Sequence, residues 1–241
     1  MIALAIDAAT DRLSVALAAA DGAVAERHLV GARAHARSLI PMIDELLRAA
    51  GAGSPAGISR VVLADGPGSF TGLRVAAAVG KALVRAGSAQ LLTAPSLLGR
   101  AWTARAGRPG LVLSASSALR GEIYAGWYDL APDRTVQVVQ EAVAMGFDAV
   151  RAGRRPECIV GDASDGMLEA LAAHWGVTLV SREESQADAR GLLELLAVPG
   201  AVSVVGAPDR WEPTYGRPAE AQAKWEREHG RPLSDSTGHP G

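Results

Sequence analysis

Alternating and continuous runs of apolar residues divide the first half of the chain into short strands and helices. Three strands come first, and Asp21-Gly22 is a hairpin signal between the second and the third. The helix that follows has one apolar face, made of Leu39, Met42, Ile43, Leu46 and Leu47. The predicted elements are strands at 2–8, 12–19 and 23–29, a helix at 34–50, a strand at 60–65, a helix at 72–86, a strand at 90–94 and a helix at 95–106.

The second half repeats this order more faintly. Its predicted elements are strands at 111–115, 121–129 and 134–139, a helix at 141–151, a strand at 157–161, a helix at 165–174, a strand at 177–180 and a helix at 184–197. Both halves therefore have the order βββαβαβα, in which hairpins give antiparallel strands and βαβ units give parallel ones. This duplication predicts an α/β fold of two related lobes with mixed sheets.

The lobe boundary is expected in the glycine- and proline-containing segment near residue 108. We expect an N-terminal lobe at 1–107, a C-terminal lobe at 108–200, an extension at 201–227 and a disordered tail at 228–241. After residue 200 the apolar pattern fails, because prolines interrupt it and the end is polar and rich in turn residues.

Composition and charge narrow the class of protein. The 241 residues are 49% hydrophobic, which is enough to bury a core. The net charge is −2 without a basic block, so unaided binding of nucleic acid is not expected. There is no apolar run of about 18 residues and no basic start typical of a signal peptide. Cys158 is the single cysteine, so we expect a soluble cytoplasmic protein without disulfides.

The stretch DGPGSFTGLR at 65–74 is the most distinctive motif. It follows a predicted strand and opens a helix, and Gly66, Gly68 and Gly72 permit backbone angles closed to other residues. Ser69 or Thr71 can cap the helix, whose free amides would suit an anion. No lysine follows Gly72, so this is not a P-loop. A ligand or partner loop and a tight strand-to-helix turn both stay open, and Gly68→Val is expected to disturb either, because a β-branched residue resists positive φ.

The helix after this loop carries Gly72, Ala76 and Gly80 at intervals of four. Such a ridge of small residues allows another helix to approach closely. The same ridge can pack on the chain's own sheet, and the spacing alone favours that interpretation.

The polar candidates elsewhere are isolated. Asp7 and Thr10 end the first strand, where a carboxylate can hold a metal or polarise water, although turn bonding to nearby backbone is the favoured interpretation. Arg120 and Glu122 share one face of a predicted strand, as a surface pair would. No two histidines have the HxxxH spacing of metal ligands on a helix, and His35 is expected at the surface or at a lobe contact.

Taken together, several segments resemble the TsaB (YeaZ) family of bacterial tRNA threonylcarbamoyladenosine biosynthesis proteins. The resemblance covers residues 2–130 well and 200–220 thinly, and it implies a two-lobed actin-like ATPase (ribonuclease-H-like) fold. The matching segments are IALAIDAAT with SVAL, HARSLIPMIDELL, DGPGSFTGLRVAAAVGKAL, APSLLGRA, RGEIYAGWYD and the P-x-Y-x-R of Pro213, Tyr215 and Arg217.

The resemblance also implies a role without catalysis by this chain alone. The family resembles a degenerate paralogue of the subunit that transfers threonylcarbamoyl from its adenylate to an adenosine beside the tRNA anticodon. That TsaD-like relative holds its metal with an HxxxH motif shortly after the glycine loop, whereas residues 93–99 here contain no histidine. We therefore expect an accessory subunit that binds and positions a TsaD-like partner, with a TsaE-like ATPase as a further partner. ATP and a metal are expected on the partners, tRNA only through the complex, and a homodimer when the chain is alone.

The first two helices of the first lobe are the pairing surface that the resemblance implies. The expected interface residues are His35, Leu39, Met42, Ile43, Leu46, Leu47, Gly72, Ala76 and Gly80. The candidate loop or nucleotide contacts are Asp7, Thr10, Gly66, Gly68, Ser69, Thr71, Arg120 and Glu122. The family often has Asp-Ala-Arg-Arg before the Gly-Glu-x-Tyr strand, where this chain has Ser117-Ala118-Leu119-Arg120.

An independent nucleotide-dependent transferase with its site between the lobes is the alternative. A metallopeptidase would need metal ligands that the sequence does not supply.

Overall fold

The computed structural model describes residues 1–31, 34–52, 54–106, 108–118, 121–163, 166–181, 183–186 and 188–215. The predictions for Arg120, Arg217 and the tail at 228–241 lie outside these ranges.

A mixed sheet of six strands forms the first half, in the order β11-β5-β4-β1-β2-β3. The strands β1, β2 and β3 pair antiparallel, and β4 and β5 run parallel to β1. Two long helices, α1 and α2, pack on this sheet, and their apolar faces share one core with it. The bounds are β1 (Ile2–Asp7), β2 (Arg12–Ala18), β3 (Val24–Val30), α1 (His35–Ala49), the 3₁₀ turn η1 (Pro55–Gly57), β4 (Ile58–Ala64), α2 (Phe70–Ala86), β5 (Gln90–Ala94) and β11 (Ser203–Val204).

The second sheet has five strands in the order β10-β9-β6-β7-β8. This is the order β5-β4-β1-β2-β3 of the first sheet, strand for strand, so the predicted duplication βββαβαβα is confirmed. The bounds are β6 (Gly110–Ser117), β7 (Ile123–Leu130), β8 (Val136–Met145), α4 (Phe147–Arg151), β9 (Cys158–Gly161), α5 (Met167–Trp175) and β10 (Thr178–Leu179).

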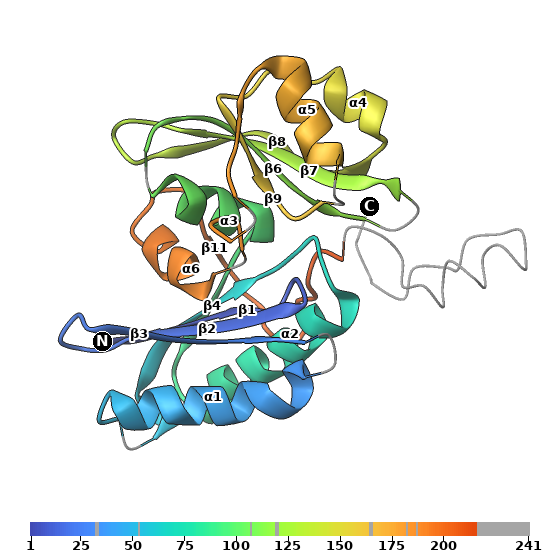
Figure 1. Cartoon of the computed structure of the whole chain (residues 1–241). Coiled ribbons are helices and arrows are strands. Elements are labelled where there is room, and N and C mark those ends of the chain that lie inside the picture. The colour runs from blue at the N-terminus through green and yellow to red at the C-terminus, as the bar shows by residue number, and fades with distance from the viewer. Residues whose placement is uncertain are drawn as a thin grey trace, which may run out of the picture.

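The last helix of each half packs on the sheet of the other half. Helix α3 (Ser96–Arg105) lies against β6, β7 and β9, while α6 (Ala189–Leu195) lies against β1, β2 and β4. Figure 1 shows the resulting layers: α1 and α2 under the first sheet, α3 and α6 between the sheets, and α4 and α5 over the second sheet. One apolar core runs from both sheets through α3 and α6, so side chains occupy the space between the sheets at this level.

A pair of glycines lets α3 and α6 cross closely. A Cβ atom added to Gly99 would lie 2.9 Å from a methyl group of Leu192, and one added to Gly191 would collide with the hydroxyl of Thr103. The close helix–helix contact through small residues that the sequence suggested for α2 therefore exists here instead, inside the chain.

Three elements, β8, α4 and β11, differ from the sequence-based expectation. A helix was predicted from 141, but β8 continues to Met145 and α4 keeps only five residues. The pairing of β8 with β7 shifts register near Trp127, which breaks the alternation by which a strand is recognised. The short strand β11 was not predicted, because two residues carry too little pattern. The lobe boundaries stay predictions, and α6, which belongs to the 108–200 segment, packs on the first sheet.

Candidate functional site: the glycine loop and the outer helices

The glycine loop, residues 65–72, leads from β4 into the first turn of α2. Ser69 is the N-cap of α2, and its hydroxyl accepts a hydrogen bond from the Gly72 amide at 3.2 Å. The capping role predicted for Ser69 is confirmed, while Thr71 is exposed in the first turn of α2. The loop therefore begins the helix as its sequence suggested.

Each of the three glycines in the loop faces a backbone carbonyl of another segment. A Cβ atom would collide with the carbonyl oxygen of Thr214 at Gly66, of Ala9 at Gly68 and of Ala8 at Gly72. The positions that a side chain would fill are thus taken by main chain from the β1–β2 hairpin and from the C-terminal segment.

Positive φ is required at only one of these glycines. Gly66 has φ +109°, but Gly68 does not lie in the left-handed region. The reason given for the sensitivity of Gly68 is therefore corrected: the obstacle to a side chain there is the Ala9 backbone, not the backbone angle.

Hydrogen bonds fix the loop to the same neighbours. The Gly66 amide donates to Ser96 Oγ at 3.0 Å, and the Ser69 amide donates to the Ala9 carbonyl at 2.6 Å. The Asp65 carbonyl accepts from the Thr214 amide at 2.7 Å. The loop is a junction of three chain segments whose contacts are made within the protein.

Two carboxylates, the buried Asp7 and the partly buried Asp65, lie at the carboxyl ends of β1 and β4, which are parallel neighbours. Burial raises the pKa of Asp7 to about 6, although a hydrogen bond from the Ala9 amide and the charge of Arg100 act in the opposite direction. Burial likewise raises the pKa of Asp65 to about 6, against a hydrogen bond from Thr93. Both carboxyl groups thus take up a proton far more readily than an exposed aspartate does.

Local turn chemistry accounts for the polar end of β1. The Ala9 amide donates to Asp7 Oδ1 at 3.0 Å, and the Arg12 amide donates to Thr10 Oγ1 at 3.1 Å. The turn-bonding interpretation of Asp7 and Thr10 is confirmed. Glu122 is exposed just before β7.

The predicted interface residues lie on the inner side of α1 and α2. Their side chains are at most 8% exposed, and a Cβ atom at Gly80 would lie 2.9 Å from Leu63 of β4. This corrects their assignment to a surface, because an apolar stripe marks the buried side of a helix and the chain's own sheet covers it. Burial also lowers the pKa of His35. The residues concerned are His35, Leu39, Met42, Ile43, Leu46, Leu47, Gly72, Ala76 and Gly80.

An ion pair between α3 and the loop after β9 was not found by sequence reasoning. Arg100 is 2% exposed, and its Nη1 and Nη2 atoms lie 2.7 and 3.2 Å from the two carboxylate oxygens of Asp162. Ser116 also donates to Asp162 at 2.8 Å. The two residues are 62 positions apart in the sequence, so no local spacing predicts that they form an ion pair.

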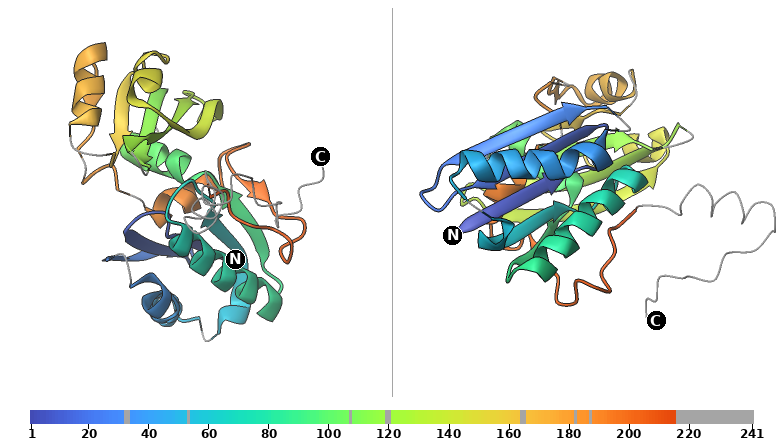
Figure 2. Two further views of the ribbon diagram at one scale, coloured as in Figure 1. Left: turned by 90° about the vertical axis from the view of Figure 1, so that its right-hand side faces the viewer. Right: turned by 90° about the horizontal axis from the view of Figure 1, so that it is seen from below.

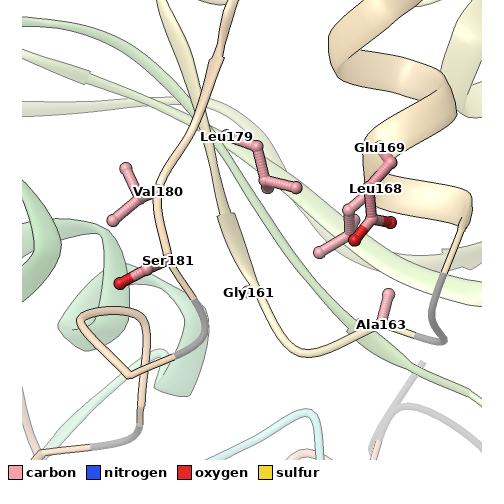
Figure 3. Close-up of a pocket in the computed structure, with 7 residues that line it drawn as sticks. All are labelled: Gly161, Ala163, Leu168, Glu169, Leu179, Val180 and Ser181. Atoms are coloured by element: carbon pink, nitrogen blue, oxygen red, sulfur yellow. The ribbon is translucent and has the colours of Figure 1, made fainter.

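A shallow pocket of about 200 Å³ lies beside this loop, at the carboxyl ends of β9 and β10 and the first turn of α5 (Figure 3). Its lining residues are Gly161, Ala163, Leu168, Glu169, Leu179, Val180 and Ser181.

Comparisons with known proteins bear on this arrangement. Residues 29–158, more than half of the chain, match the family model described as "TsaD: tRNA N6-adenosine threonylcarbamoyltransferase". The "tRNA threonylcarbamoyladenosine biosynthesis protein TsaB" of Bacillus subtilis is 26% identical over 93% of this chain and 98% of its own length. The chain belongs to the TsaB (YeaZ) family. The Escherichia coli protein of the same description is 34% identical over 50% of this chain and 52% of its own.

A solved structure extends the likeness to the fold. It is titled "Crystal structure of an uncharacterized protein with similarity to peptidase YEAZ from Pseudomonas aeruginosa", with 26% identity and a TM-score of 0.72 over 90% of this chain and 99% of its own. The two-lobed actin-like fold expected for the TsaB family is thereby confirmed. The family-model match runs from the end of β3 to the start of β9, so it includes α1, the glycine loop and α2.

Two general properties of the described ranges complete the picture. Within them, no helix is both long and apolar enough to cross a bilayer. In the same ranges, no three side chains of His, Cys, Asp or Glu are grouped so that they could hold a metal ion.

Proposed function

We propose that this chain acts in tRNA threonylcarbamoyladenosine biosynthesis as a non-catalytic subunit that binds and positions a TsaD-like threonylcarbamoyltransferase. The full-length similarity to a protein named for this pathway supports the assignment. In this proposal a TsaE-like ATPase is a further partner, and ATP and a metal are bound by the partner subunits. The chain reaches tRNA only through the complex, and it forms a homodimer when the partner is absent.

The observation that carries the non-catalytic part is the occupied glycine loop. In a chain that matches a transferase family, the loop's three glycines admit backbone carbonyls of the chain itself. The core through α3 and α6 occupies the space between the sheets. Both features favour a loop that packs segments of the chain together over a loop that binds substrate. They also disfavour the alternative of an independent transferase with a nucleotide between the lobes.

The outer side of α1 and α2 is the surface we propose for the partner. Ile40 on α1 is 62% exposed, outside the apolar face that this helix buries. On α2 the residues Ala78 and Ala82 are exposed one turn apart. Small residues there permit a second helix to approach closely.

A matched pair of substitutions on α2 tests this surface. Ala76 is 1% exposed and faces the sheet, while Ala82 is exposed on the side of the helix away from the sheet. Ala76→Arg should unfold the first sheet, because a charge would be buried without a partner. Ala82→Arg should leave the melting temperature nearly unchanged and weaken pairing with the TsaD-like partner by about a hundredfold or more.

Size-exclusion chromatography with light scattering measures the pairing, and circular dichroism measures the fold. If the Ala82→Arg and Ile40→Arg variants both fold and both assemble as well as the unchanged chain, this surface is excluded.

The catalytic part is tested with tRNA and supplied threonylcarbamoyl-adenylate. We expect no threonylcarbamoyladenosine from the chain alone, and its formation once the partner is added. Robust modification by the purified chain, with nucleotide binding and turnover of its own, would establish the independent transferase instead.

A further inference from the structure

The C-terminal strap, residues 207–215, runs antiparallel to α2 along the edge of that helix. Arg85 Nε lies 3.1 Å from Asp209, and Lys81 Nζ lies 3.3 Å from Glu212. The right-hand view of Figure 2 shows α1, α2 and the orange-red end of the described chain side by side. The strap therefore lies beside α2 on the side away from α1, in the same layer as the two helices.

The strap and α2 match in spacing as well as in charge. Arg74, Lys81 and Arg85 are separated by seven and four positions, which places them on one side of the helix. Seven helical residues span about 10 Å, and three extended residues span about the same length. This is the step from Glu212 to Tyr215, so the two segments keep register between the Lys81 contact and the Arg74 contact.

Aromatic rings close the end of the strap over the first turns of α2. The rings of Phe70 and Tyr215 have their centroids 4.5 Å apart, and the Arg74 guanidinium lies 4.6 Å from the Phe70 centroid. Arg74 Nε donates to Tyr215 Oη at 3.3 Å, and Tyr215 Oη donates to Glu212 at 2.8 Å. Near the other end, Lys81 Nζ lies 5.8 Å from the centroid of the Trp211 ring.

The protonation state of Glu212 reflects these contacts. Burial alone would raise the pKa of Glu212, but the hydrogen bonds from Tyr215 and Lys81 outweigh burial and hold the pKa below its usual value. The Glu212 carboxylate thus stays ionised, and it accepts from Tyr215 within the strap and pairs with Lys81 of α2.

The strap also contacts the glycine loop directly. The Thr214 amide donates to the Asp65 carbonyl at 2.7 Å, and the Thr214 carbonyl occupies the space beside Gly66. Pro213 is buried next to it. One short segment thus touches both the start of α2 and the loop that precedes it.

The contacts along α2 are individually weak and partly exposed. An exposed ion pair changes an equilibrium constant by only about two- to fivefold, and salt screens it. A row of such pairs with ring contacts holds a segment in place and still allows it to open locally without unfolding of the core.

We propose that the strap is a clasp whose closure fixes the glycine loop and the first turns of α2, and thereby the surface that α2 offers to the partner. The second half of this statement rests on the proposed function. The first half concerns this chain alone.

Amide hydrogen exchange of the full chain tests the clasp. Tyr215→Ala and Glu212→Gln should each accelerate exchange at residues 66–75, by about tenfold for Tyr215→Ala, because the loop opens when the strap leaves. Tyr215→Phe keeps the ring contact and should show a smaller change. Asp148→Asn is the matched control, since it removes an exposed ion pair with Arg151 on α4. Raising the salt concentration should act on the unchanged chain in the direction of Glu212→Gln.

Affinity for the TsaD-like partner is measured on the same variants. Faster loop exchange together with about fivefold weaker binding of Tyr215→Ala supports the clasp. Faster exchange confined to 207–215 overturns the clasp. Faster exchange at residues 66–75 with unchanged affinity overturns the second half of the proposal, the effect on the partner surface. If the unchanged chain does not bind the partner at all, the proposed function fails, and the exchange at residues 66–75 still decides whether the strap holds the loop.

Discussion

The loops that follow β4 and β9 occupy corresponding places in the two halves, but the carboxylate in each loop has a different environment. Each follows the strand that lies parallel to the first strand of its half. In the first loop, Asp65 is partly buried and hydrogen-bonded to Thr93, and the loss of solvent raises its pKa to about 6. In the second loop, Asp162 pairs with Arg100 from α3 and also accepts from Ser116.

The difference shows that the duplicated fold preserves the path of the chain but not the chemistry at the strand ends. The first loop is covered by main chain from Ala8, Ala9 and Thr214, so its glycines serve close packing. The second loop meets a charged side chain from the exchanged helix α3 and borders a shallow pocket. Three substitutions test this contrast.

Gly68→Val should give the largest effect. The new side chain would have to displace the Ala9 backbone, and we expect a loss of about 3 kcal/mol or more in the free energy of unfolding. For a chain of this size that is a fall of roughly 6 to 12 °C in melting temperature. Gly146→Val is the control, because Gly146 has φ −69° and a Cβ atom there meets open space. Equal melting temperatures for the two variants would show that the loop has room for a side chain.

Arg100→Met should cost less, about 2 kcal/mol, because it leaves Asp162 without its cation but in partial contact with water. The same change should raise the pKa of Asp7 further, since the charge of Arg100 lowers it. Arg151→Met, which removes an exposed pair with Asp148, should be nearly neutral. Chemical denaturation and NMR titration measure the two effects. An unchanged Asp7 pKa in a folded Arg100→Met variant would contradict the assigned electrostatic link.

Asp65→Asn should change the pH dependence of stability rather than abolish folding. The folded pKa of about 6 lies above the ordinary value of 3.8, so the native state binds the extra proton. The contribution is therefore present in full below about pH 4 and is lost as the pH rises through 6. Asp65→Asn should remove about 2 kcal/mol of this decline between pH 4 and pH 7.

Denaturant unfolding at several pH values measures that slope. Asp133→Asn serves as the control, because hydrogen bonds from Thr135 lower the pKa of Asp133, so its replacement should leave the slope between pH 4 and pH 7 unchanged. Parallel pH profiles for Asp65→Asn and the unchanged chain would show that the partly buried carboxyl group does not titrate in this range.

Much of the fold was predictable because its signals are local. The order of strands and helices follows from apolar periodicity, and Ser69, as a capping residue, indicated where α2 begins. What escaped prediction joins distant segments: the exchange of α3 and α6, the Arg100–Asp162 pair, and the antiparallel pairing of β11 with β5. Periodicity identified which side of α1 and α2 is apolar, but it did not say whether the sheet or a partner covers that side.

The exchange of α3 and α6 has a consequence for synthesis on the ribosome. The first sheet emerges within the first 94 residues, but the helix that covers its inner face arrives only at Ala189. Its edge strand β11 follows at Ser203. The nascent N-terminal half must therefore wait for roughly one hundred further residues, or about 5 to 20 seconds of translation, before its apolar inner face is covered.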